Sequence, residues 1–452
     1  MKRLLFHAFL LLVLTFPAGA LLAQDEVATP GEELFPAYQV DEDMRKLEPA
    51  VQPFIPQYGG WITSTVLHER VDGTTLTSSL TQVRIWLQMA FTENVYMYVR
   101  GRDIYLAEIY QEYRDIDNEN TIDLDLGYIG FKNDDSTLQL ILGRKYFLVG
   151  TGLVLNDRAD GAEVKLYSNI VNLELFGAYT GFLQEDSNPY NLSTKDFSEG
   201  AKRVFAGGTI SRGIGNQELY VLGVAQVDMG DQESDQKTRY QSQYYGLGLK
   251  GVISDSLDYY AEGVYEMGTS YNTSNEESDI QAFAAQAGLQ WFLPYSLNPS
   301  LIVQYAFGSG DADKSNYSDP RGNARGNDTG FLGFGTYVGG YALRPQLANL
   351  HVIRGGGSFT PFSGLQQFWL QRLSLTAKYS YYMKHRVAGT INNGEASEPE
   401  RFVGHGGDLL LRWKIFYDFS IFAGYAVFLP GDAYPDSADE RTFAMGGVTL
   451  VF

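Results

Sequence analysis

The stretch that decides the fold reads QVRIWLQMAF and runs from Gln82 to Phe91. Its apolar side chains take every second position, beginning at Val83, and the positions between them include Arg84 and Gln88. A period of two is the period of a β-strand, whose successive side chains point to opposite faces. The sequence therefore predicts a strand with one apolar face and one polar, partly charged face.

The same alternation returns along the chain in segments of about 9–12 residues, the length that a tilted strand needs to cross a bilayer. The polar positions of these segments carry Arg100, Arg102, Asp123, Asp125, Glu163, Lys165, Arg372, Lys378, Asp408 and Arg412. A soluble β-sandwich also alternates, so the alternation by itself leaves both classes of fold open.

The lengths of the connections separate these two classes. Short turns are expected at 92–94, 132–136, 213–216, 254–256 and 417–418. They alternate with long polar loops, expected at about 69–79, 105–121, 145–160, 181–201, 229–241, 269–277, 309–346, 385–403 and 429–440. Outer-membrane barrels alternate in this way because their periplasmic turns are short and their extracellular loops long. The segments predict an all-β fold, a transmembrane antiparallel up-and-down β-barrel of about 18 strands.

The first residues are typical of a signal peptide. Lys2 and Arg3 precede a mostly apolar run and small residues, so residues 1–23 are expected to be the signal. Residues 24–57 are acidic, contain proline and lack the period of two, which indicates a periplasmic N-terminal lead-in. Residues 58–452 are then the outer-membrane β-barrel.

The end of the chain agrees with this location. Arg441 to Phe452 alternate as a last strand, and Phe452 is the terminal residue. That ending resembles the signature by which the barrel-assembly machinery recognises its clients. The sequence therefore predicts the bacterial outer membrane as the location, with its lipid and the barrel-assembly machinery as partners.

Composition excludes several classes of function. The formal net charge is −20, which argues against a protein that wraps nucleic acid. Cysteine is absent, so there is no thiolate metal site, no Cys nucleophile and no lipid anchor on Cys. No cofactor and no metal are expected.

Enzyme signatures are nearly absent. The run from Gly246 to Gly251 matches a dinucleotide fingerprint letter by letter, but it lies inside a strand-like segment and no helix follows. The histidines show no metal-ligand spacing. His68, His385 and His405 would lie near the outer rim, which leaves a barrel hydrolase open as a third class of function. The sequence favours a protein that is not an enzyme.

The charged faces carry the functional prediction. A cation that faces lipid at the midplane costs roughly 2–4 kcal/mol, so these faces are expected to line the lumen. Cations in a narrow pore attract anions, and nearby carboxylates keep those anions from being trapped. Alternatively, the same charges form ion-pair networks that hold a wide barrel rigid.

Three short stretches resemble a known family. They are Gly143-Arg144-Lys145 with Asn156 to Gly161, then Gly308 to Asp311, and then Gly424 to Asp432. These stretches are similar to the alginate-export family of outer-membrane barrels. The resemblance implies an 18-stranded monomeric barrel with an electropositive constriction that conducts a polyuronate out of the periplasm. It also implies that Arg144, Arg158 and Asp160 form or brace that constriction.

The expected function is a passive pore that exports an anionic, alginate-like polysaccharide through an Arg- and Lys-lined lumen. The alternative is a diffusion porin for small anionic or sugar solutes. The predicted substrate path is the charged set already named, extended by Arg84, Arg144, Arg158 and Asp160.

Overall fold

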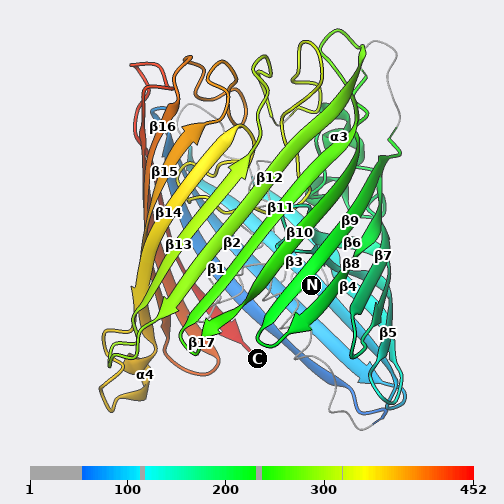
Figure 1. The fold of residues 1–452 in the computed structure, drawn as a ribbon. Coiled ribbons are helices and arrows are strands. Elements are labelled where there is room, and N and C mark those ends of the chain that lie inside the picture. The colour runs from blue at the N-terminus through cyan, green and yellow to red at the C-terminus, as the bar shows by residue number, and fades with distance from the viewer. Residues whose placement is uncertain (1–52, 112–117, 231–236, 318) are drawn as a thin grey trace, which may run out of the picture.

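The computed structural model describes residues 53–111, 118–230, 237–317 and 319–452. Eighteen antiparallel strands form one barrel, which closes because β1 pairs with both β2 and β18 (Figure 1). The strands are β1 (Gln57–Val71), β2 (Thr74–Ala90), β3 (Val95–Gln111), β4 (Asn118–Lys132), β5 (Leu138–Val149), β6 (Leu155–Leu166), β7 (Asn172–Tyr179), β8 (Arg203–Ile214), β9 (Gln217–Asp228), β10 (Gln241–Ser254), β11 (Leu257–Tyr271), β12 (Glu277–Phe292), β13 (Ser300–Gly308), β14 (Leu350–Phe359), β15 (Leu373–Lys384), β16 (Phe402–Lys414), β17 (Phe419–Pro430) and β18 (Arg441–Val451). The predicted fold class is confirmed.

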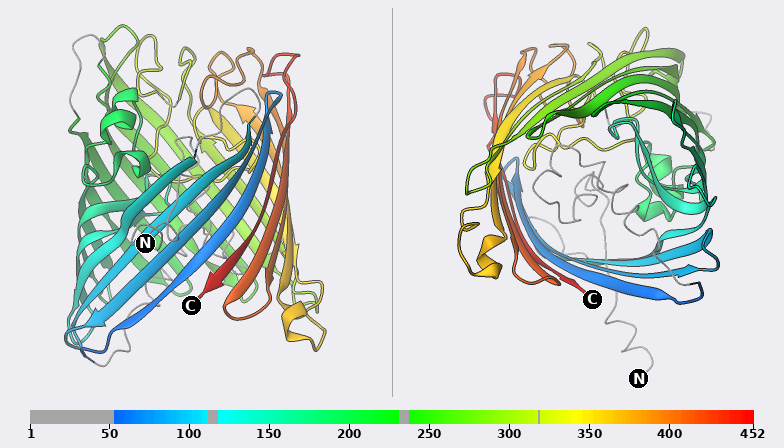
Figure 2. Two further views of the ribbon diagram at one scale, coloured as in Figure 1. Left: turned by 180° about the vertical axis from the view of Figure 1, so that it is seen from behind. Right: turned by 60° about the horizontal axis from the view of Figure 1, so that its bottom comes forward.

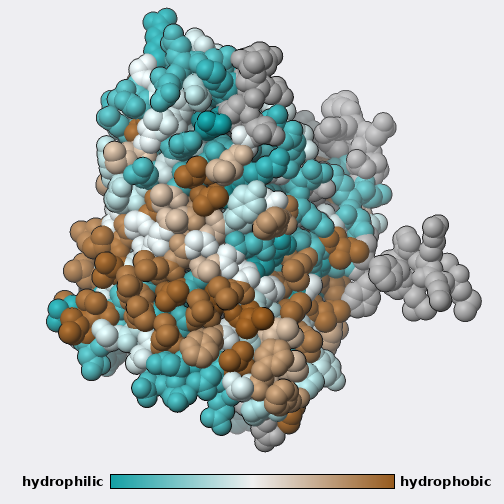
Figure 3. Space-filling view, turned by 90° about the vertical axis from the view of Figure 1, so that its right-hand side faces the viewer, coloured by the Kyte–Doolittle hydropathy of each residue, from teal (hydrophilic) through white to brown (hydrophobic). Residues whose placement is uncertain are grey.

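The period of two sorts the side chains between the two faces of the wall. On β2, Ile85 and Leu87 are 44% and 39% exposed on the outer surface, while Arg84, which precedes Ile85, is 5% exposed. On the face drawn in Figure 3, apolar side chains gather in a band across the lower half of the barrel, with hydrophilic surface above it. Exposed apolar side chains such as Ile85 on β2, Leu219 on β9 and Tyr425 on β17 lie on strands all around the barrel, so this is the surface that meets outer-membrane lipid.

The connections alternate in length, with three corrections. The loop predicted at 105–121 is shorter, because β3 continues to Gln111 and β4 begins at Asn118. The loop predicted at 69–79 is a two-residue turn, because Asp72 and Gly73 both adopt positive φ, as a tight Asp-Gly hairpin requires. The polar residues on either side of this turn belong to the ends of β1 and β2 and not to a loop. The long loops at 180–202 and 309–349 are confirmed.

The loop predicted at 145–160 is also wrong, because β5 and β6 continue through most of it. In the wall, β5 pairs with β4 only up to Arg144, and β6 pairs with β7 only from Asp160 onward. Between these points the two strands pair with each other and bend into the lumen (Figure 2). We call residues 145–159 the inward hairpin.

A second segment, the loop 309–349, also lies inside the barrel. We call it the inner loop. Its Phe334 N–H donates to the carbonyl of Val154 at the tip of the inward hairpin, 3.0 Å away. Further along, Tyr341 N–H donates to Asp408 on β16. The largest buried apolar cluster joins the hairpin, this loop and the wall strands β7–β17. The tertiary core of the barrel therefore lies within its lumen.

Helices are few among the described residues. The connection between β7 and β8 contains η1 (Glu185–Ser187) and α3 (Thr194–Glu199), and α4 (Phe368–Gln371) precedes β15. No helix in the described part of the chain is long and apolar enough to cross a membrane. The predicted signal peptide, residues 1–23, and the predicted lead-in up to residue 52 lie outside the described residues.

Candidate functional site

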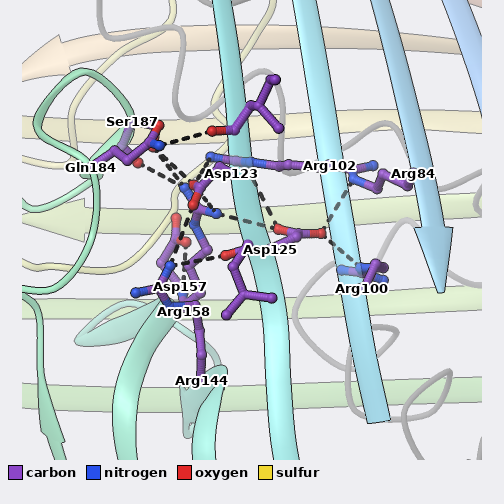
Figure 4. A network of polar contacts seen from close by, with 12 residues as sticks. Arg84, Arg100, Arg102, Asp123, Asp125, Arg144, Asp157, Arg158, Gln184 and Ser187 are labelled. Carbon is purple, nitrogen blue, oxygen red and sulfur yellow. Dashed lines mark hydrogen bonds and ion pairs between the residues drawn. The ribbon is translucent and has the colours of Figure 1, made fainter. Parts of the chain in front are cut away.

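Five arginines from four strands meet on the inner face of one side of the barrel (Figure 4). We call them and their carboxylate partners the arginine cluster. Its members are Arg84 on β2, Arg100 and Arg102 on β3, Asp123 and Asp125 on β4, Arg144 on β5, and Asp157, Arg158 and Asp160 on β6. All but Asp157 are residues that the sequence singled out.

Asp125 is the buried centre of the cluster. Its Oδ2 lies 2.7 Å from Arg100 Nε and 3.4 Å from Arg84 Nε, and its Oδ1 lies 3.5 Å from Arg158 Nη1. A buried carboxylate keeps its charge only when cations and hydrogen bonds compensate for lost water. These contacts supply that compensation.

Asp123 connects the wall to the inward hairpin. Its carboxylate lies 2.6 Å from Arg158 Nη1, and 3.3 Å from both Arg102 and Arg144. Ser187, in the connection between β7 and β8, donates its hydroxyl to the same carboxylate at 3.1 Å. The Asp123 carboxylate therefore contacts both strands that leave the wall, β5 and β6, and the connection between β7 and β8.

Gly143 marks the point at which β5 leaves the wall. Its φ is +130°, and a Cβ there would lie 2.2 Å from the carbonyl oxygen of Gly127 on β4. Only glycine tolerates both conditions. The irregular backbone turns Arg144 toward Asp160, at 2.8 Å, and toward the carbonyls of Leu124 and Phe182.

A second group of charges lies beside the cluster on β5, β6 and β7. Lys145 pairs with Glu163, Lys165 lies 3.7 Å from the same carboxylate, and Lys165 also lies 3.5 Å from Glu174. The sequence predicted Glu163 and Lys165 on one face, and the structure places them in this chain of alternating charges.

The remaining predicted residues lie on β15 and β16, which β17, β18 and β1 separate from the cluster, or outside the strands. Asp408 on β16 pairs with Arg354 on β14, while Lys378 lies opposite Asp408 in the strand register and Arg412 shares the face of Asp408. Arg372 departs from the prediction. It caps α4 before β15 begins and stacks on Phe368 and Tyr417, because the strand starts one residue later.

Comparison with known proteins identifies the family. The alginate export family model matches residues 68–447, which is most of the chain. The chain belongs to the alginate export family. This confirms the resemblance seen in the sequence, and no curated protein matches the chain.

Solved structures share the fold of this alginate export family barrel at low sequence identity. Pseudomonas aeruginosa OccK8 (OprE) is 10% identical, with a TM-score of 0.57 over 89% of this chain and 99% of that one. OccK2 (OpdF) of the same organism, solved in complex with glucuronate, is 14% identical with a TM-score of 0.56, over 89% and 100%. OpdK, solved with vanillate, is 10% identical with a TM-score of 0.55, over 88% and 99%. The protein is an outer-membrane pore, and family and fold indicate a channel and not an enzyme.

Sequence reasoning missed several ion pairs of this alginate export family member. Arg203, at the start of β8, pairs with Asp196 at 2.6 Å and with Asp228 at 3.3 Å. Lys314 in the inner loop pairs with Asp328 at 2.6 Å. Arg354 alternates with the exposed Ile353 in the same way as Arg84 with Ile85, so the period of two would have found it.

The charge balance of the cluster differs from that of the whole chain. Five guanidinium groups face four carboxylates, whereas the chain has a formal net charge of −20. The cluster thus carries a formal excess of one positive charge within an acidic protein. Within the described residues, no group of three or more His, Asp or Glu side chains is placed to hold a metal ion.

Proposed function

We propose that this pore exports an anionic, alginate-like polysaccharide along the inner face of β2–β6. The observation that carries the proposal is the arginine cluster, in which five guanidinium groups line one side of the lumen. Each guanidinium is a planar fork that matches a carboxylate, the charged group of a polyuronate.

The existing ion pairs suit passage better than tight capture. Each arginine of the cluster already has an aspartate within 4 Å, so a passing carboxylate exchanges with a resident one. Conduction needs binding that is strong enough to admit the ion and weak enough to release it. The aspartates supply the weakening, and the fixed arginines supply the attraction.

The two inward segments support the same path. The tip of the inward hairpin and the loop 309–349 join the buried apolar cluster with β7–β17, while Arg158 at the base of the hairpin stays in the arginine cluster. The apolar packing occupies that side of the lumen, so the polymer passes along the wall that carries the arginines.

The second candidate is a diffusion porin for small anionic or sugar solutes. It is favoured by OpdF and OpdK, since these structural neighbours were solved with glucuronate and with vanillate, which are small carboxylates. The two candidates differ in how blockade of the pore depends on the length of the solute.

Planar-bilayer conductance tests the proposal with oligouronates of increasing length and with glucuronate alone. Export predicts anion selectivity and blockade that strengthens with chain length. Arg84→Gln combined with Arg100→Gln should weaken this blockade, and Arg212→Gln, an exposed arginine near the end of β8, should not. A strongly cation-selective channel that is insensitive to uronates would contradict export, and blockade independent of length would favour the porin.

A further inference from the structure

A group of aromatic rings lies on the inner face directly beside the arginine cluster. The rings belong to Trp61 on β1, Trp86 on β2, Tyr96 and Tyr98 on β3, and Tyr128 on β4. All five lie toward the end of the wall at which the short 91–94 and 133–137 turns join β2 to β3 and β4 to β5. Short turns mark the periplasmic side. Tyr96, Tyr98 and Tyr128 are therefore nearer to the periplasmic mouth than Arg100 is, whereas Trp61 is opposite Arg84 and Trp86 is opposite Arg100 in the register.

Two of these rings lie against glycines of neighbouring strands. Trp86 is opposite Gly59 in the register, and a Cβ on that glycine would lie 2.9 Å from the indole. Tyr96 is opposite Gly130, and a Cβ there would lie 2.2 Å from the phenol ring. An aromatic ring that covers a cross-strand glycine lies along the wall and not across the lumen. One face of each ring is therefore directed at the wall and the other at the lumen.

Buried rings hold these two in place. Trp86 packs against Tyr98, with centroids 6.2 Å apart and planes 20° apart. Tyr98 packs against Tyr128 at 5.4 Å and 29°, and Tyr96 meets Tyr128 edge-on. Tyr98 and Tyr128 are buried, whereas Trp86 and Tyr96 are half-buried. The half-buried rings thus keep an accessible surface on a rigid support.

Trp61 joins the rings to the charges. Its indole, also half-buried, lies 5.3 Å from the guanidinium of Arg100 and 5.6 Å from that of Arg84. Apolar ring faces and carboxylate-binding forks are therefore adjacent on three neighbouring strands. We call Trp61, Trp86 and Tyr96 the aromatic platform.

We propose that the aromatic platform is a saccharide-binding subsite that holds the pyranose rings of the polymer beside Arg84 and Arg100, which receive the carboxylates. A pyranose ring presents C–H groups on its faces, and these pack on the electron-rich face of an aromatic ring. The carboxylate at the edge of a uronate can then reach a guanidinium. This inference rests on the proposed export function and names the site where the sugar is bound.

An oligosaccharide can contact more of this surface than a single small carboxylate such as vanillate can. The accessible rings are spread over β1, β2 and β3, so successive sugar units can be in contact at once. Along an outward path the platform begins at Tyr96, which is nearer to the periplasmic turns than Arg100, and ends beside the charges at Trp61 and Trp86.

The test is blockade of single-channel current by oligouronates added on the periplasmic side. Trp86→Leu and Tyr96→Leu should each weaken blockade by about fivefold, while anion selectivity in simple salt stays unchanged. Trp86→Phe should retain most of the affinity, because it keeps an aromatic face. Trp291→Leu is the matched control, since Trp291 is 49% exposed on the outer surface of β12. Heat-modifiable migration of each variant reports whether the barrel has folded.

Neutral oligosaccharides of the same length separate the two proposals. If the wild-type pore ignores uronates, export of a polyanion fails, and loss of neutral-saccharide blockade in Trp86→Leu still upholds the platform. If every saccharide blocks wild type, Trp86→Leu and Tyr96→Leu equally, the proposal of the aromatic platform is overturned. Such a result leaves the export proposal standing. A wild-type pore that no saccharide blocks overturns both proposals.

Discussion

Arg158 on β6 lies 2.6 Å from Asp123 on β4, although β5 stands between these strands in the order of the wall. The contact is possible because β5 and β6 leave the wall together above Gly143. The arginine cluster on the inner face therefore also attaches the inward hairpin to β4 of the wall.

Replacing Asp123 should weaken the attachment of the inward hairpin to β4. Asp123→Asn removes the charge that faces Arg102, Arg144 and Arg158, and loss of one partner from a buried ion pair costs about 3–5 kcal/mol. We expect a lower temperature of heat-modifiable unfolding and larger, noisier single-channel currents. Asp160→Asn is the control, because its side chain is 24% exposed and pairs with Arg144. Equal effects of the two substitutions would contradict the role of Asp123 in attaching the inward hairpin to the wall.

Glu266 on β11 should anchor the inner loop. Its carboxylate accepts a hydrogen bond from Leu332 N–H at 2.9 Å and others from the hydroxyls of Tyr240 and Tyr244. Glu266→Ala leaves the Leu332 N–H and the Tyr240 hydroxyl without this acceptor, at about 1–3 kcal/mol each, while the Tyr244 hydroxyl keeps the carbonyl of Leu332 at 2.6 Å. Limited proteolysis within 309–349 should become faster and conductance should rise. Glu218→Ala, which affects an exposed pair with Lys250, should leave both unchanged.

Gly143 should not tolerate a side chain. Gly143→Ala combines a positive φ with a Cβ 2.2 Å from a backbone oxygen of Gly127, and such strain costs about 1–3 kcal/mol. We expect a lower yield of folded barrel in refolding followed by gel migration. Gly223→Ala, where a new Cβ meets nothing within 4 Å, provides the comparison. Equal refolding yields would show that the wall does not depend on this glycine.

Acid should release the base of the inner loop at His385. Burial lowers the pKa of His385 below its ordinary value of 6.5, and Arg386, His351 and Arg401 add to this. The neutral ring accepts the N–H of Gly310 at Nδ1, 3.1 Å away, which the protonated ring cannot do. This stabilisation is complete above pH 6.5 and is lost as the pH falls through the lowered pKa.

The measurement is channel noise and proteolysis of the loop as a function of pH. His385→Gln should abolish the acid transition, whereas His68→Gln, on the exposed surface of β1, should preserve it. An unchanged transition in His385→Gln would assign it to another group.

Neighbouring residues of β8 should differ sharply in their tolerance of charge. Ile210 is 53% exposed on the outer surface, so Ile210→Arg places a cation against lipid at roughly 2–4 kcal/mol. Thr209→Arg places the same cation on the inner face, opposite Glu174 in the register. Folding into lipid vesicles should fail or weaken in the first variant and proceed in the second. The reverse result would invert the assignment of the two faces.

The fold was predictable where local pattern and tertiary structure agree. The alternation in 82–91 assigned Ile85 and Leu87 to the outer face and Arg84 to the inner face, and the structure has them so. Prediction failed where polarity was taken for irregularity. Asp72-Gly73 closes a hairpin in two residues, and 145–160 is largely strand, because a hairpin inside the lumen can be as polar as a loop.

The candidate site was predictable in membership but not in arrangement. Period and family resemblance together selected Arg84, Arg100, Arg144 and Arg158. Their meeting depends on Gly143 and on the departure of β5 from β4. Arg203 was missed because its partner Asp196 lies in a short helix within a loop, where no period exists.

The sequence by itself determined which face of each strand meets lipid, because burial of apolar side chains in a bilayer forces a period of two. Only the tertiary structure decided how the lumen is filled. The inward hairpin is held by contacts between residues far apart in the chain, such as the backbone N–H of Thr151 with Glu262 on β11, 2.9 Å away. Such contacts leave no periodic trace, since each depends on the closure of the whole barrel.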